Sequence, residues 1–88
     1  MEQTMDKVMK DIVSQDNDKK MYCLTLLQKM LDGIDSDVSE MEPIYSEDDG
    51  AISWVRVYYK SGFDICINVE CDSPMAMVRD IIHKAELR

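Results

Sequence analysis

Residues 52–69 read ISWVRVYYKSGFDICINV, two alternating runs of β-branched and aromatic residues around a short loop at 60–62. This pattern predicts two antiparallel strands joined by a three-residue loop, with Gly62 in the left-handed position. A two-residue turn would instead place Arg56 opposite Ile67 and mix the two faces. The three-residue loop gives one largely apolar face, with the pairs Tyr59–Phe63, Val57–Ile65, Val55–Ile67 and Ser53–Val69.

Amphipathic helices are predicted before this hairpin. Apolar residues at helical spacing predict helices over about 2–13 and 18–32, separated by turn-like residues at 14–18. No Gly or Pro interrupts 14–18, so one fused helix is the open alternative. The second helix has so wide an apolar face that we expect it to be covered on two sides. Gly33 suits a left-handed residue at its end.

The chain ends in another predicted helix, over 73–87, with Ser73 as N-cap and Pro74 at its first position. Residues 41–45 predict a short strand, and Pro43 makes it an edge strand. The predicted order is therefore α-α-β-β-β-α, a single α+β domain over residues 1–88. We expect a small two-layer domain, a three-stranded antiparallel meander with helices packed on one face.

The order helix, three strands, helix over residues 18–88 is similar to that of double-stranded-RNA-binding domains. That family grips phosphates with lysines at the start of its last helix. The matching stretch here, residues 71–77, reads CDSPMAM and has no base before Arg79. The resemblance is therefore one of topology and does not imply RNA binding.

Neither a metal site nor a catalytic pair is predicted. An EF-hand loop starting at Asp35 would have Glu40 where glycine is needed and Ser46 where glutamate is needed. The single histidine, His83, lies on a different element from Cys66, which argues against a cysteine nucleophile. We expect no cofactor and no enzymatic activity. The number of cysteines is odd, which argues against a disulfide framework. The sequence shows no signal peptide and no apolar run long enough for a membrane helix, so we expect a cytoplasmic protein.

The net charge of −8 resides in one segment, because residues 32–49 hold eight acids and no base while the other residues are neutral overall. Such segregation creates a directed negative field that attracts basic surfaces and repels nucleic acid. The ordinary reading is a solvated loop that keeps the protein soluble. The functional reading is a partner-binding segment, with candidate residues Asp35, Asp37, Glu40, Glu42, Glu47, Asp48 and Asp49.

The second face of the hairpin adds Trp54, Arg56 and Tyr58, the residue types most enriched at binding hot spots. The predicted register places them opposite three polar or small residues, Asn68, Cys66 and Asp64. The structural reading is a set of ordinary cross-strand pairs on a solvated sheet. The functional reading is a partner surface that continues the acidic segment.

These features predict a small, acidic, non-enzymatic inhibitor or adaptor. Its acidic surface would dock on a basic protein, a nuclease or another nucleic-acid-binding protein, and would mimic nucleic acid. In size and acidity the chain is similar in character to phage or mobile-element proteins that inhibit host nucleases, including anti-CRISPR inhibitors. The alternative is a regulatory or structural subunit that acts through homo-oligomerisation, for example as a homodimer. We expect no direct nucleic-acid or membrane contact.

Overall fold

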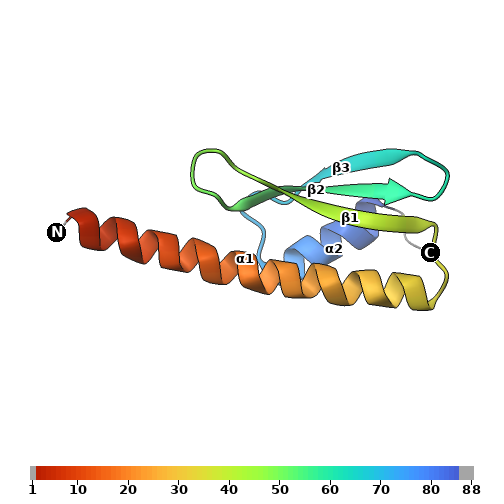
Figure 1. Cartoon of the computed structure of the whole chain (residues 1–88), viewed down its shortest axis with the longest axis horizontal. Helices are drawn as coiled ribbons and strands as arrows, with labels where there is room; N and C mark the ends of the chain where they lie inside the picture. The colour runs from red at the N-terminus through yellow and green to blue at the C-terminus, as the bar shows by residue number, and fades with distance from the viewer. Residues whose placement is uncertain (1, 86–88) are drawn as a thin grey trace.

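The computed structural model describes residues 2–85, with side chains placed from residue 11 onward. Figure 1 shows two layers, a three-stranded sheet and two helices that lie on one of its faces. This confirms the predicted α+β fold and the antiparallel meander. Within the described residues no helix has the length and apolar character needed to cross a membrane. The elements in chain order are α1 (Glu2–Gly33), β1 (Val38–Tyr45), β2 (Ile52–Tyr59), β3 (Asp64–Asn68) and α2 (Pro74–Lys84).

The hairpin has the predicted register. Val55 pairs with Ile67 and Val57 pairs with Ile65 in antiparallel fashion. Gly62 adopts a φ of 90°, and its N–H donates to the carbonyl of Tyr59 at 2.9 Å, so the three-residue loop is confirmed. Strand β2 lies in the middle of the sheet, with β1 and β3 at its edges.

The core lies between the sheet and the two helices. Valine and isoleucine alternate along β2 and β3, so every second side chain reaches the helix layer. The helices contribute residues three or four positions apart, which share one face. The buried apolar residues are Leu24, Leu27, Leu31, Val38, Ile52, Val55, Val57, Ile67, Val69, Met77, Ile81 and Ala85.

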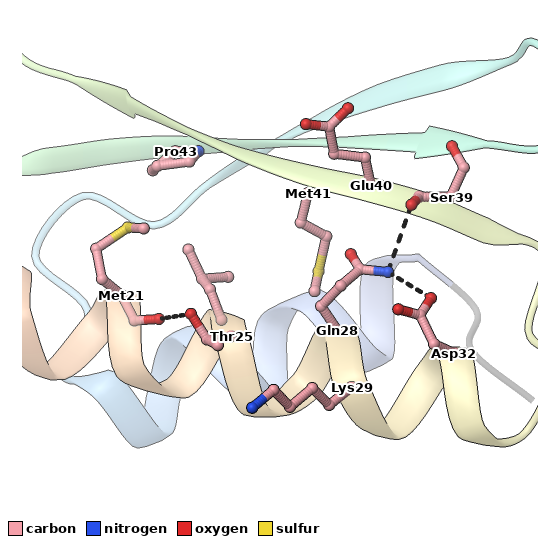
Figure 2. A pocket seen from close by; sticks show the side chains of 10 residues that line it. Met21, Thr25, Gln28, Lys29, Asp32, Ser39, Glu40, Met41 and Pro43 are labelled. Atoms are coloured by element: carbon pink, nitrogen blue, oxygen red, sulfur yellow. Dashed lines mark hydrogen bonds between the residues drawn. The ribbon is translucent and has the colours of Figure 1, made fainter.

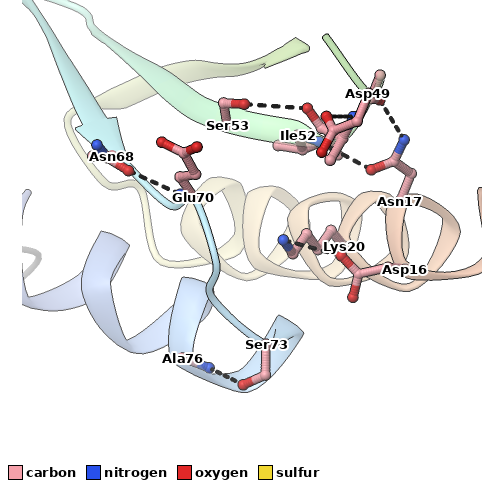
Figure 3. Close-up of polar contacts among 12 residues, drawn as sticks. Asp16, Asn17, Lys20, Asp49, Ile52, Ser53, Asn68, Glu70, Ser73 and Ala76 are labelled. Carbon is pink, nitrogen blue, oxygen red and sulfur yellow. Dashed lines mark hydrogen bonds and ion pairs between the residues drawn. The ribbon is translucent and has the colours of Figure 1, made fainter. Parts of the chain in front are cut away.

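The predicted break at 14–18 is wrong, because α1 runs without interruption from Glu2 to Gly33. The turn-like residues are held in the helix by other contacts. The Asn17 amide donates to the carbonyl of Gly50 at 2.9 Å and accepts from the N–H of Ile52 at 3.0 Å (Figure 3). Asp16 also pairs with Lys20 one turn later, at 3.1 Å. The fused alternative is therefore the observed one.

The end of α1 and the start of β1 also differ from the prediction. Gly33 is still helical, and Asp35 takes the left-handed conformation instead, with a φ of 55°. Strand β1 contains the predicted 41–45 strand at the edge of the sheet but begins earlier, at Val38. Val38 is 1% exposed, so its burial in the core extends the strand into the acidic segment.

Helix α2 begins as predicted. Ser73 is its N-cap and accepts from the N–H of Ala76 at 3.2 Å, and Pro74 follows at the first position. The helix ends at Lys84, and Ala85 caps it. The Tyr59 hydroxyl donates to the Ala85 carbonyl at 3.1 Å, which fastens this end to the sheet. The predicted extension to residue 87 lies outside the described residues.

Candidate functional site

The outer face of the sheet, on the side away from the helices, is the candidate site. Strand pairing arranges nine side chains on it in three rows. Trp54 is 40% exposed and Arg56 is also exposed, whereas Tyr58 is half-buried. We call this surface the outer sheet face. Its rows are Ile44–Trp54–Asn68, Glu42–Arg56–Cys66 and Glu40–Tyr58–Asp64.

Arg56 is at the centre of a polar network on this face. Its Nε donates to Oδ2 of Asp64 at 2.6 Å, and its guanidinium lies 5.6 Å from the centre of the Tyr58 ring. The Tyr58 hydroxyl donates to Oε2 of Glu42 at 3.3 Å. The network spans all three strands, so the side chains are held in place before any partner binds. Such preorganisation lowers the entropy cost of binding.

The network also affects the protonation of its members. The hydrogen bond and the charge of Asp64 raise the pKa of Arg56 above its ordinary value. Partial burial raises the pKa of the Tyr58 phenol, and the carboxylate of Glu42 raises it further. At neutral pH the phenol therefore keeps its proton and can donate it in a hydrogen bond. Because three carboxylates surround one guanidinium, the face is negatively charged.

The acidic segment does not form a single patch. Strand β1 runs through it and, at about 3.3 Å per residue, separates its two ends by roughly 25 Å. Figure 1 shows the loop before β1 and the β1–β2 turn at opposite ends of the sheet. Asp35 is partly neutralised by Lys60 at 3.1 Å. The prediction of one continuous acidic surface is therefore wrong, because β1 is extended and places the acids before it and after it at opposite ends of the sheet.

The candidate acids thus fall into three groups. Glu40 and Glu42 lie on the outer sheet face beside Trp54, Arg56 and Tyr58. Two lie in the loop between α1 and β1, and the rest lie in the β1–β2 turn, where they are exposed. The loop group is Asp35 and Asp37, and the turn group is Glu47, Asp48 and Asp49.

A first hollow, with a volume of about 370 Å³, lies between α1 and β1 (Figure 2). Gln28 crosses it and donates to Oδ1 of Asp32 at 2.9 Å and to the carbonyl of Ser39 at 3.4 Å. The buried Oε1 of the same amide has no hydrogen-bond partner. The hollow is largely apolar around Met21 and Met41, and the hydrogen bond from Gln28 to Ser39 joins β1 to α1 across it.

A second hollow, of about 300 Å³, lies between α1, the start of β2 and residues 70–72, which lead into α2. Figure 3 shows Asp16, Lys20, Ile52 and Glu70, four of the residues that line it. Lys20 lies beside it, 2% exposed. Burial raises the pKa of the Asp72 carboxyl, the neighbouring Asp80 raises it further, and Lys20 lowers it. Oδ2 of Asp72 has no hydrogen-bond partner. Two charged carboxylates cannot donate to one another, but a single proton on either would allow a hydrogen bond between them.

We expect Asp72→Asn to change how stability depends on pH. Because the folded state raises the pKa of Asp72, it binds the proton more tightly than the unfolded state does. The resulting stabilisation is complete below the unfolded pKa and is lost as pH rises through the folded pKa. Asparagine has no proton to lose in this pH range. At pH 7 the free energy of unfolding of the variant should therefore equal that of the wild type or exceed it by up to about 1 kcal/mol. Urea unfolding at several pH values between about 3.5 and 7.5 measures the difference.

Asp48→Asn is the control, because Asp48 is exposed in the β1–β2 turn. It removes the same charge and should leave the pH dependence close to that of the wild type. If the difference in free energy of unfolding between Asp72→Asn and the wild type did not change with pH, the raised pKa of Asp72 in the folded state would be contradicted.

The other chemistry considered from the sequence finds no support in the geometry. Among the described residues no group of three or more His, Cys, Asp or Glu is placed to hold a metal ion. Cys66 lies on the outer sheet face, and His83 lies on α2 beneath the opposite face, so the sheet separates them. Within the described part of the chain the three cysteines are free thiols.

Comparison with protein-family models, curated proteins and solved structures gives no match for this chain. Five of the nine residues of the outer sheet face are candidate site residues predicted from the sequence, and three others are their predicted cross-strand neighbours. Ile44 was missed, because the sequence predicted no register between residues 41–45 and the hairpin, so the pairing of this isoleucine with Trp54 could not be assigned.

Proposed function

We propose that this chain is a small, non-enzymatic binding protein whose outer sheet face docks on a basic protein surface. One observation carries the proposal: an exposed tryptophan next to an arginine and a tyrosine, bordered by carboxylates on an edge strand. Trp, Tyr and Arg supply much of the energy at protein interfaces, and surrounding charge supplies specificity and speed of association. A nuclease or another nucleic-acid-binding protein is the partner class that fits, because its own binding groove is basic.

The acids outside this face have a different role in the proposal. The loop acids Asp35 and Asp37 and the turn group at 47–49 lie at the two ends of β1, apart from the nine residues of the outer sheet face. They add to the negative field and thereby to the rate of encounter with a basic partner. In this form the chain is an inhibitor or adaptor that occupies a basic groove, as a phage or mobile-element anti-defence protein does.

We expect the outer sheet face to control capture of the partner from a lysate of the native host. Trp54→Ala should weaken binding by at least about 30-fold, because it removes the aromatic anchor. Glu40→Gln with Glu42→Gln should weaken binding about tenfold in roughly 50 mM salt and little in roughly 500 mM salt, where charges are screened. Quantitative mass spectrometry of the captured proteins at both salt concentrations measures these effects.

The matched control is Glu47→Gln with Asp48→Asn, which removes the same charge from the β1–β2 turn. It should reduce capture less than about threefold, since these residues act only through the long-range field. Equal capture by the wild type and by Trp54→Ala would refute the assignment of the face. Capture that does not depend on salt would refute its electrostatic character.

A further inference from the structure

Helix α1 extends beyond the rest of the domain. Its 32 residues span about 48 Å at 1.5 Å per residue, close to the longest extent of the molecule, 51 Å. Figure 1 shows its N-terminal part projecting past the sheet and α2. All side chains of α1 that are buried among the described residues lie at Lys20 or later, and Ile12 is 56% exposed. A helical segment of about 12 residues without a partner is only marginally stable in water.

The sequence gives this helix an apolar seam over its whole length. Starting at residue 5, positions spaced alternately by four and three residues lie along one side of the helix, as in a coiled coil. Six of the eight are apolar, and the two polar ones are neighbours at the centre of the seam. The positions are Met5, Met9, Ile12, Asp16, Lys19, Cys23, Leu26 and Met30.

The C-terminal half of the seam borders an apolar groove. Cys23, Leu26 and Met30 line it from α1, and Met75, Val78 and Ile82 line it from α2. The groove has a volume of about 520 Å³. Although α1 is covered by the sheet and by α2, Leu26 is 44% and Met30 64% exposed. An apolar surface this continuous is typical of an interaction site.

We propose that two copies of this chain form an antiparallel dimer in which the N-terminal half of each α1 lies in the groove of the other copy. The charges on the seam select this orientation. When the two helices run in opposite directions about the midpoint of the seam, Lys19 of each copy lies opposite Asp16 of the other. Asp16 already pairs with Lys20 of its own chain, but its side chain is 38% exposed and can accept from a second cation. The same alignment places Ile12 opposite Cys23. A parallel pair would bring Asp16 against Asp16 and Lys19 against Lys19, which is repulsive.

The area is sufficient for a reversible dimer. The seam on α1 is about 38 Å long and about 10 Å wide, and α2 adds a strip about 16 Å long on each copy. Roughly 500 Å² of projected surface per copy is therefore covered, which suits a concentration-dependent dimer better than an obligate one. The arrangement is isologous, so it closes with two copies and does not propagate into a filament. The outer sheet face, on the far side of the domain, stays free for a partner in both copies.

Sedimentation equilibrium of the full chain between about 5 and 500 µM tests the proposal. The wild type should be a dimer at the upper end and dissociate on dilution. Met30→Glu should weaken the dimer by at least about 30-fold, because it places a charge in the apolar groove. The control is Ser14→Glu, since Ser14 is exposed on the same helix and is not three or four residues from any seam position. It should leave the dimer unchanged within about twofold. A monomeric wild type over the whole range, or equal effects of the two substitutions, would overturn the proposal.

A charge reversal tests the orientation. Lys19→Glu should weaken the dimer about tenfold, because it places two acids opposite each other at both central positions. In a parallel dimer Lys19 already faces Lys19 of the second copy, so the substitution would only exchange one like-charge pair for another. An unchanged affinity would therefore overturn the antiparallel arrangement. Circular dichroism of each variant confirms that α1 stays helical.

Discussion

Replacing Ile67 by aspartate is expected to unfold the protein at neutral pH. Ile67 is 2% exposed and pairs with Val55 between the sheet and the helices. A charged carboxylate there would have no partner and costs more than about 4 kcal/mol. The total stability of 88 residues is only about 4–13 kcal/mol. Far-UV circular dichroism and urea titration at pH 7 measure the loss.

The neighbouring position gives the matched control. Cys66 precedes Ile67 on β3, but it is exposed on the outer sheet face and pairs with Arg56. Cys66→Glu adds the same charge one residue away and should change the free energy of unfolding by less than about 1 kcal/mol. If both substitutions were tolerated, or both unfolded the protein, the assignment of the two sheet faces would be wrong.

This pair of positions also explains why the sheet could be predicted from the sequence. Alternation has a period of two, so a slip by one residue would bury Arg56 and expose Val57. Of the two loops compared, the three-residue loop 60–62 avoids that slip and the two-residue turn does not. The local sequence therefore determines the hairpin without any information about the helices. The N-cap of α2 is equally local, because Ser73 and Pro74 act on the backbone beside them.

The failed predictions depend on contacts between distant residues. Residues 14–18 have turn composition, and nothing nearby in the sequence marks them as helical. They stay in α1 because Asn17 bonds to the backbone at Gly50 and Ile52, 33 and 35 residues away. Strand β1 reaches back to Val38 for a similar reason, since Val38 is buried in a core that it helps to form. Local propensity is a weak guide where such contacts compete with it.

The candidate site was only partly predictable for the same reason. The period of two placed Trp54, Arg56 and Tyr58 on one face, and this holds in the structure. Charge alone marks the acidic segment in the sequence, and charge density does not indicate whether a chain is coiled or extended. Once β1 extends it, only Glu40 and Glu42 accompany those three residues.

Replacing Ile81 by alanine is expected to lower the free energy of unfolding by about 2–5 kcal/mol. Ile81 is fully buried, and it is the side chain of α2 that lies deepest in the core together with Met77. Its removal leaves a cavity where α2 meets α1 and the sheet, which the rigid strands cannot close. Urea unfolding should show a lower midpoint with little change in slope, because the native fold is retained.

Ile82→Ala separates core packing from the groove. Ile82 follows Ile81 on the same helix but is 43% exposed at the groove between α1 and α2. At low protein concentration its replacement should cost less than about 1 kcal/mol, since close to half of the residue's surface is already in contact with water. If a second copy fills the groove, the cost should grow with protein concentration, because the variant then also weakens the dimer. The effect of Ile81→Ala on the folding of each copy should not depend on concentration, so measurements at about 5 and 200 µM distinguish the two positions.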